Sequence, residues 1–200
     1  MKIMFVDSKR KTSEIDIDFS QLPTKVYLAY SIQYKDLARH IKKKLGGVVA
    51  GSHQVLGCSK LKTHLPILLI GSGRFHAIQL AISSTQDIYT LEGSKVVKVG
   101  SEEVEKAKQK KKGAYLRYLN ADSVGVLIST KLGQYNLKQA VSIKSKIKGK
   151  KSYLFISNMI SGHNLDDFSS IESWINTACP AIHLDSSKIV NAEDVKWQST

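Results

Sequence analysis

Short apolar runs alternate with amphipathic segments along almost the whole chain, and few folds accommodate that pattern. Residues 25–30, 65–70 and 124–129 are apolar runs of strand length, while residues 33–45 and 102–119 have helical periodicity. Further strands are expected at 87–91, 96–99, 153–156 and 174–177, and further helices at 76–83 and between Asn136 and Gly149. This order predicts an α/β protein of two consecutive small parallel-sheet modules with helices packed on the sheets.

The division between the modules is expected near Val99–Ser101, where the long helix begins. Residues 21–100 then form one module and residues 101–200 the other. Each module contains one of the two cysteines, Cys58 and Cys179.

Charge favours an acidic partner. The chain has 30 Lys and Arg against 17 Asp and Glu, a formal net charge of +13. Such a field attracts RNA, a ribosome or an acidic protein, although lysine runs such as 106–112 and 144–151 are also typical of solvated helix faces. No apolar run approaches the roughly 18 residues of a membrane helix, so we expect a cytoplasmic protein without a membrane partner.

The cysteines and histidines form no local metal motif. Cys58 and Cys179 are 121 residues apart, and no Cys-x-x-Cys pair is present, which excludes a zinc site within one loop. The six histidines show no metal-ligand spacing. A reducing compartment disfavours a disulfide. Two buried inert thiols and a Cys–His nucleophile pair both remain open.

Loops after the predicted strands are candidate ligand sites, because ligands bind beyond the carboxyl ends of parallel strands. Gly71 and Gly73 open a helix, where backbone amides hold a carboxylate or phosphate, and Arg74 adds a positive charge. Gln134 follows the strand that ends at Ser129. The Gly71 segment lacks the third glycine of a dinucleotide fingerprint and the Gly-Lys-Ser/Thr of a P-loop. A tight turn with a surface arginine is the alternative.

Four segments together resemble one family, the archaeal-type enzymes that begin diphthamide synthesis. The segments are Gln54–Cys58, Leu68–His76, Gly125–Gln134 and Thr177–Asp185, and their order and spacing are also similar to the family's. The resemblance covers roughly residues 22–195.

The resemblance implies a 2-(3-amino-3-carboxypropyl)histidine synthase. Such enzymes have three α/β modules, each giving one cysteine to a [4Fe–4S] cluster. They transfer a 3-amino-3-carboxypropyl group from S-adenosylmethionine to a histidine of translation elongation factor 2 by radical chemistry. By resemblance, Cys58 and Cys179 are iron ligands, and Gly71, Gly73, Arg74 and Gln134 line the S-adenosylmethionine site. Thiolates are the ligands that such clusters take.

The sequence departs from the family at its start, because the first module and its cysteine are absent. Residues 1–20 then correspond to the remnant strand region of that module, with strands expected at 2–6 and 15–19. Three explanations follow: an N-terminally incomplete enzyme, a homodimer or complementary chain that supplies the third cysteine, or a shortened relative without the chemistry.

Two rival functions belong to other classes. One is a basic RNA- or ribosome-binding accessory protein on the same fold, with both cysteines buried. The other is a cysteine hydrolase.

Overall fold

The computed structural model describes residues 6, 8, 16–56, 59, 61–71, 73–184 and 186–196. The chain divides into two compact units, residues 1–105 and 106–200. The sequence analysis put the division between residues 100 and 101. The two compact units of the structure divide five residues later, between residues 105 and 106, inside a continuous helix. Within the described part of the chain, no helix has the length and apolar character needed to cross a bilayer.

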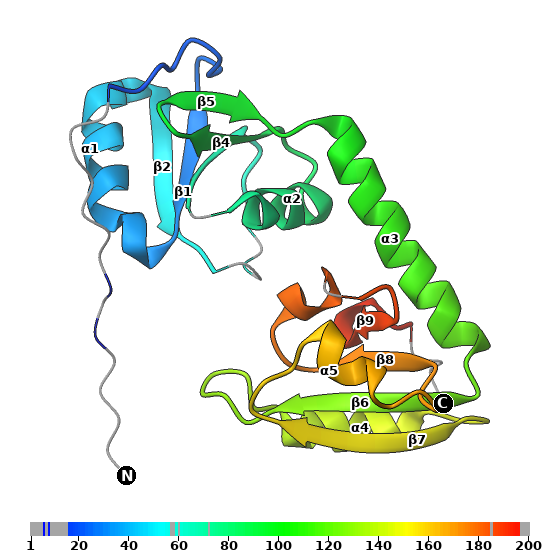
Figure 1. The fold of residues 1–200 in the computed structure, drawn as a ribbon. Coiled ribbons are helices and arrows are strands. Elements are labelled where there is room, and N and C mark those ends of the chain that lie inside the picture. The colour runs from blue at the N-terminus through cyan, green and yellow to red at the C-terminus, as the bar shows by residue number, and fades with distance from the viewer. Residues whose placement is uncertain are drawn as a thin grey trace. The chain divides into compact units, whose positions relative to one another are not determined.

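The first unit is a five-stranded sheet with the order β2-β1-β3-β4-β5. All neighbouring pairs are parallel except β4 and β5. The elements are β1 (Val26–Tyr30), α1 (Lys35–Leu45), β2 (Val49–Gln54), β3 (Ile67–Ile70), α2 (Arg74–Ser83), β4 (Ile88–Glu92) and β5 (Lys95–Lys98), with short 3-10 turns at Ile32–Tyr34 and Gly46–Val48 (Figure 1).

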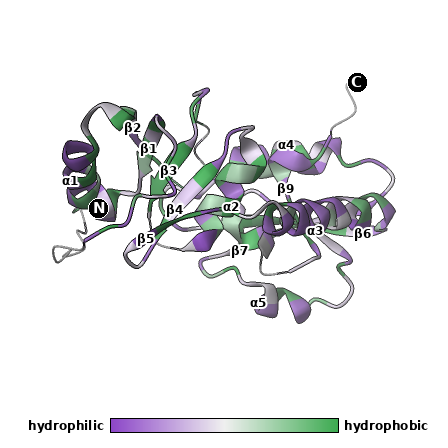
Figure 2. Cartoon of the chain, turned by 90° about the horizontal axis from the view of Figure 1, so that it is seen from above, coloured by the Kyte–Doolittle hydropathy of each residue, from purple (hydrophilic) through white to green (hydrophobic). Residues whose placement is uncertain are grey.

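Helices α1 and α2 cover opposite faces of this sheet. Leu68 and Ile70 share one core with Leu37 and Ile41 of α1. Ile67 and Leu69 point the other way and pack with α2. A central parallel strand is thus buried on both faces, which explains why residues 67–70 are all apolar. Figure 2 shows hydrophilic residues gathered on α1 and hydrophobic residues in the strands it covers.

The segment before β1 is not the regular strand predicted at 15–19. Asp18 makes one isolated bridge with Lys95, and Ile17 is buried in the core that α1 covers. Ile15 lies outside the described residues, as do residues 2–5 of the other predicted strand. The described part of this segment therefore packs on the first unit.

The second unit is a four-stranded parallel sheet with the order β7-β6-β8-β9. It follows the long helix α3 (Ser101–Asn120), whose first turns belong to the first unit. The elements are β6 (Ser123–Ser129), α4 (Leu137–Lys146), β7 (Lys151–Ser157), α5 (Gly162–Asp166), β8 (Ser173–Asn176) and β9 (Ile189–Asn191), with 3-10 turns at Pro180–Leu184 and Ala192–Asp194.

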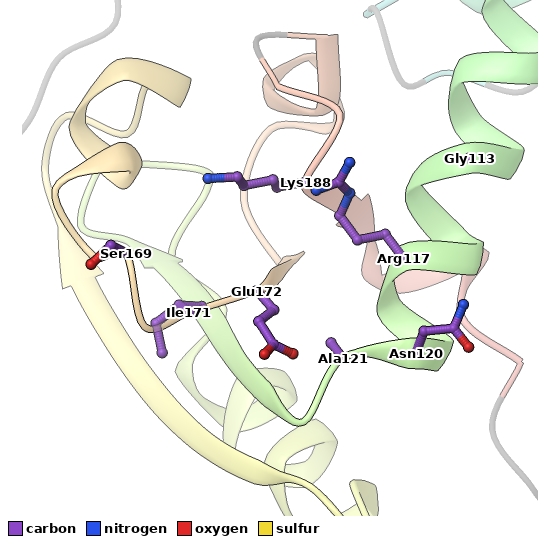
Figure 3. Close-up of a pocket in the computed structure, with 8 residues that line it drawn as sticks. All are labelled: Gly113, Arg117, Asn120, Ala121, Ser169, Ile171, Glu172 and Lys188. Atoms are coloured by element: carbon purple, nitrogen blue, oxygen red, sulfur yellow. The ribbon is translucent and has the colours of Figure 1, made fainter.

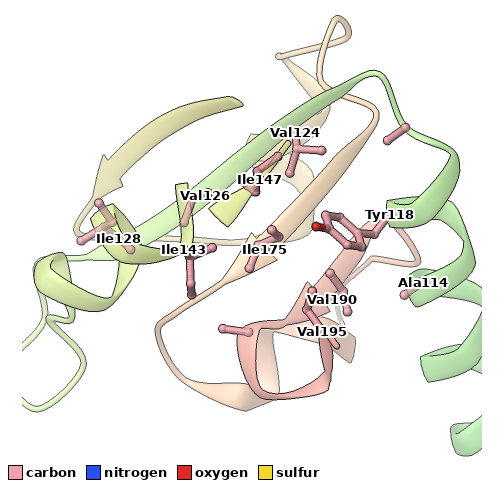
Figure 4. Close-up of a cluster of buried hydrophobic side chains, with 13 residues drawn as sticks. Ala114, Tyr118, Val124, Val126, Ile128, Ile143, Ile147, Ile175, Val190 and Val195 are labelled. Carbon is pink, nitrogen blue, oxygen red and sulfur yellow. The ribbon is translucent and has the colours of Figure 1, made fainter. Parts of the chain in front are cut away.

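Two apolar cores hold this sheet. On one face, Ile143 of α4 and Tyr118 of α3 pack over the strands (Figure 4). On the other face, Trp174 of β8 is fully buried in a cluster with Leu165 of α5. The Trp174 ring lies directly over Gly125 of β6: a Cβ built there would be 2.2 Å from the ring. Gly125 is therefore the residue that lets this tryptophan lie flat in the sheet's core.

Candidate functional site

The first unit has a crevice at its topological switch point. The chain runs from β1 to β2 on one side of the sheet and returns to β3 on the other side, so the loops beyond β1 and β3 separate. A cavity of about 160 Å³ lies there. Its walls come from the segments after β1, β2 and β3 and from α2: Ser31, Ile32, Gln33, Val55, Leu56, Ser59, Leu69, Gly71, His76 and Leu80.

Gly71 and one hydroxyl give this cavity polar character. Ser31 Oγ is buried and has no hydrogen-bond partner among the described residues. A Cβ built on Gly71 would lie 3.6 Å from that oxygen. Gly73, with a φ of 91°, occupies the N-cap position of α2 in a conformation that favours glycine. An unpaired buried hydroxyl beside backbone without a side chain is a place where a polar ligand atom gains a bond.

Arg74 does not present a free charge to this cavity. Its Nε and Nη2 hydrogen-bond the carboxylate of Glu103 at 2.8–3.0 Å, and its Nη1 bonds Glu92. The hydrogen bonds to Glu103, and then to Glu92, raise the pKa of Arg74. The arginine therefore ties the start of α2 to the start of α3 and to β4. Its predicted contact with S-adenosylmethionine stays a prediction, and these ion pairs do not favour it.

In the second unit, the predicted site residues lie at the carboxyl ends of β6 and β8. Cys179 is a free, half-buried cysteine three residues beyond β8. Gln134 closes a turn, its backbone N–H donating to Lys131 O at 3.0 Å. Asn136 occupies the N-cap position of α4, but its side chain makes no cap bond. Instead its Nδ2 donates to Thr177 O at 2.8 Å, which joins the two loops.

A buried polar network surrounds the backbone of Cys179, and sequence reasoning missed it. Asn176, Asn191 and His183 are each at most 3% exposed. Asn176 Nδ2 donates to Cys179 O at 2.8 Å and to Asn191 Oδ1 at 2.7 Å. Among the described residues, no hydrogen bond involves the sulfur itself. The network thus fixes the loop and leaves the thiol available.

Cys58 lies outside the described residues, between Leu56 and Ser59, which both line the cavity of the first unit. Within the described residues, no group of three or more His, Cys, Asp and Glu side chains is placed to hold a metal ion. Cys179 alone, as a free and accessible thiol, fits the donor chemistry of an iron–sulfur ligand. In the second unit, Gln134 and Cys179 both lie beyond the carboxyl ends of the strands. In the first unit, Gly71 and Gly73 lie beyond the carboxyl end of β3.

A second depression lies at the opposite, amino end of the β8 and β9 strands. Arg117 and Asn120 reach into it from α3, and Glu172 and Lys188 come from just before β8 and β9 (Figure 3). Its volume is about 520 Å³. Glu172 accepts a hydrogen bond from the Asp122 backbone. The depression therefore lies away from Cys179 and mixes both signs of charge.

Comparison with known proteins identifies the family. The model of a family described as "Putative diphthamide synthesis protein" matches residues 2–189. The chain belongs to this diphthamide synthesis family. The family predicted from four sequence segments is thereby confirmed.

Two curated relatives carry the same name. The 2-(3-amino-3-carboxypropyl)histidine synthase of Pyrococcus horikoshii is 31% identical over 142 residues, which are 66% of this chain and 40% of that protein. The synthase of Methanocaldococcus jannaschii is 29% identical over 167 residues, which are 80% of this chain and 46% of that protein. The chain spans less than half the length of these two relatives.

Two crystal structures of Dph2 from Pyrococcus horikoshii, one of them with a 4Fe-4S cluster, share the fold. Each matches with a TM-score of 0.75 at 24% identity, over 88% of this chain and 57% of Dph2. This likeness confirms the predicted α/β fold with parallel sheets. The roles predicted for Cys58, Cys179, Gly71, Gly73, Arg74 and Gln134 stay predictions.

Proposed function

We propose that this chain is an enzyme fragment or subunit of a 2-(3-amino-3-carboxypropyl)histidine synthase. The reaction is the first step of diphthamide synthesis, transfer of a 3-amino-3-carboxypropyl group from S-adenosylmethionine to a histidine of translation elongation factor 2. The observation that carries the proposal is the free, half-buried Cys179 at the carboxyl end of β8, within the segment that the family matches. The cluster in Dph2 supports an iron–sulfur cofactor.

In this proposal Cys58 and Cys179 are two of the thiolate ligands of a [4Fe–4S] cluster. When bound, the reduced cluster supplies the electron that cleaves the sulfur–carbon bond of S-adenosylmethionine. The chain's own residues bind and orient. The formal net charge of +13 favours approach to an acidic factor surface. A cytoplasmic location remains a prediction.

The cavity of the first unit is the proposed S-adenosylmethionine site. It combines apolar walls with the unpaired Ser31 hydroxyl and the open backbone at Gly71, which suits a ligand with both apolar and charged parts. A volume of about 160 Å³ holds one portion of such a ligand rather than all of it. Gly73, at the start of α2, is the other proposed contact in this unit, and the role of Gln134 rests on the family resemblance alone.

Anaerobic reconstitution with iron and sulfide tests the cluster ligands. We expect Cys58→Ala and Cys179→Ala each to lower the bound iron and the visible absorption of the cluster. Ser142→Ala, an exposed change on α4, is the matched control and keeps both. If both cysteine variants bind as much iron as the control, the proposal is wrong.

One observation favours a second candidate, a basic RNA-binding accessory protein. Lys144, Lys146 and Lys148, at the end of α4, make no ion pair with any described residue. Unneutralised lysines are the phosphate contacts that such proteins use. Binding to single-stranded RNA that weakens steeply with salt and is the same with or without iron supports this candidate.

A further inference from the structure

The loop that carries Cys179 is held by side chains in addition to two backbone hydrogen bonds, from Thr177 N to Leu127 O at 3.3 Å and from Ile182 N to Cys179 O at 3.1 Å. β8 ends at Asn176, and Thr177, Ala178 and Cys179 lead into the 3-10 turn that begins at Pro180. Thr177 Oγ1 donates to Leu127 O of β6 at 2.7 Å. The backbone carbonyls of Cys179 and Pro180 both accept hydrogen bonds from buried side chains. These bonds fix the chain at Cys179 and on both sides of it.

Asn176 is the centre of this arrangement, and its amide is fully used. Its Nδ2 hydrogens go to Cys179 O and to Asn191 Oδ1, and its Oδ1 accepts the Ala178 N–H at 2.9 Å. The side chain thus closes a ring over the loop with two donors and one acceptor. Aspartate has the same shape but no donor, so only asparagine satisfies all three partners.

Asn191 extends the clamp from the neighbouring strand. The parallel register of β8 and β9 places Asn176 and Asn191 directly side by side. Asn191 receives the hydrogen bond of Asn176, and its Nδ2 donates to Pro180 O at 3.2 Å. The two amides form a chain from β9 through β8 to the backbone carbonyls of two consecutive residues, Cys179 and Pro180.

His183 completes the clamp, and its contacts fix its tautomer. Its Nδ1 lies 2.6 Å from Pro180 O. A carbonyl oxygen only accepts, so the proton is on Nδ1. Asn191 Nδ2, 3.3 Å from the same nitrogen, is then a donor facing a donor, and its bond goes to Pro180 O. Pro180 O thus receives two donors.

We propose that Asn176, Asn191 and His183 are positioning residues that hold Cys179 ready for the metal before the metal arrives. This rests on the proposed function in one respect, the ligand role of Cys179. A ligand held in place in the iron-free protein loses no loop freedom on binding. Outer partners that orient metal ligands in this way typically change metal affinity by about 10–100-fold when they are mutated.

The test uses the full chain without iron and then with it. Asn176→Asp keeps an acceptor for the Ala178 N–H but replaces the donor amide by an oxygen that faces Cys179 O and Asn191 Oδ1. This repulsion is expected to open the loop and to speed hydrogen exchange at the Ala178 amide by about tenfold. In a Cys58→Ser background, Asn176→Asp should also raise the rate at which maleimide alkylates Cys179. On reconstitution, the iron concentration for half-saturation rises by about 10–100-fold.

Asn164→Asp is the matched control, because it makes the same chemical change at an exposed position of α5. Asn191→Ala is a second variant: it removes the link to Pro180 and one acceptor of Asn176, and it leaves Asn176 bonded to Cys179 O and the Ala178 amide. It keeps the test open if Asn176→Asp does not fold, and circular dichroism shows which variants do.

The outcomes separate this inference from the proposed function. Exchange and alkylation rates equal to those of Asn164→Asp overturn the positioning role. Iron affinity unchanged in both asparagine variants, while Cys179→Ala loses iron, also overturns it and leaves the proposed function standing. If Cys179→Ala keeps its iron, the proposed function fails, whatever the asparagine variants do.

Discussion

Replacing glycine by alanine should have opposite effects on stability at Gly125 and at Gly113. A Cβ on Gly125 would be 2.2 and 2.3 Å from two atoms of the Trp174 ring, and 3.2 Å from Phe155. Phe155 packs edge-on against Trp174 with ring centroids 4.7 Å apart, and Phe168 does so at 6.0 Å, so the indole has no space to retreat. A Cβ on Gly113, in the middle of α3, meets nothing within 4 Å.

The magnitudes follow from these distances. Overpacking a core costs about 1–3 kcal/mol and sometimes more, and a fully buried ring held on two sides is near the upper end. Replacing glycine by alanine also recovers about 0.5–1 kcal/mol of chain entropy. Gly125→Ala should therefore lower the free energy of unfolding by about 2 kcal/mol. Gly113→Ala should raise it by about 0.5–1 kcal/mol, the helix-propensity difference.

Urea titration followed by far-ultraviolet circular dichroism measures both changes. Trp174→Leu added to Gly125→Ala should recover part of the loss, because the smaller side chain leaves room for the methyl group. The same displacement of β8 should also lower iron binding, since Cys179 follows that strand. Equal shifts of the two glycine variants, in either direction, would refute the packing argument.

Three further predictions concern single side chains. Burial, with a smaller contribution from Tyr115, raises the pKa of Tyr118. The folded state therefore keeps the phenol proton at a pH where the unfolded state loses it, and the free energy of unfolding falls as pH rises above about 10. Tyr118→Phe should make this fall smaller in urea titrations across that pH range. Arg74→Lys loses the forked contact with Glu103 and should cost about 1 kcal/mol in thermal unfolding, because both side chains are partly exposed. Gly71→Val should fill the cavity beside Ser31 and abolish S-adenosylmethionine binding in calorimetry without lowering the melting temperature.

The central strands were predictable because burial on both faces leaves continuous apolar runs, as at β3 and β6. β2 was not predicted. Its sequence, Val49–Gln54, is mostly small or polar, and it forms an edge strand with only its first residue buried. β9 has three residues, too few for a periodic pattern. Hydrophobic periodicity therefore identifies the buried central strands of a sheet and misses short or polar strands at its edge.

The site shows the same division between local and distant information. Cys179 and Gln134 were predicted as site residues because they follow apolar strands, where ligand loops lie, and the structure does place both beyond strand ends. The clamp was missed because Asn176 and Asn191 become neighbours only through the register of β8 with β9. The ion pairs of Arg74 were missed because its carboxylate partners, Glu92 and Glu103, are 18 and 29 residues away. Residue type and position after a strand can be read from the local sequence. Hydrogen-bond and ion-pair partners depend on how distant segments come together in the folded sheet.

The two candidate functions use opposite ends of the second unit, so one variant separates them. Cys179 and Gln134 lie at the carboxyl ends of the strands. Lys144 and Lys146 are in the last turn of α4, and Lys148 follows it. This part of the chain lies at the amino ends of the strands, where Lys150 hydrogen-bonds the carbonyls of Leu119 and Ala121 ahead of β6. Lysines at a helix C-terminus also interact favourably with the negative end of the helix dipole. Replacing them should therefore lower the free energy of unfolding by a few tenths of a kcal/mol.

Replacing these three lysines by glutamine removes three positive charges far from the cysteine. If they contact RNA phosphates, the slope of log binding constant against log salt should become smaller by about 2, at roughly 0.7 per contact for single strands. Iron content and the exchange rate of the Ala178 amide should stay the same. Loss of iron together with loss of RNA binding would mean that the two ends of this sheet do not act independently, and the assignment of function to its carboxyl end would fail.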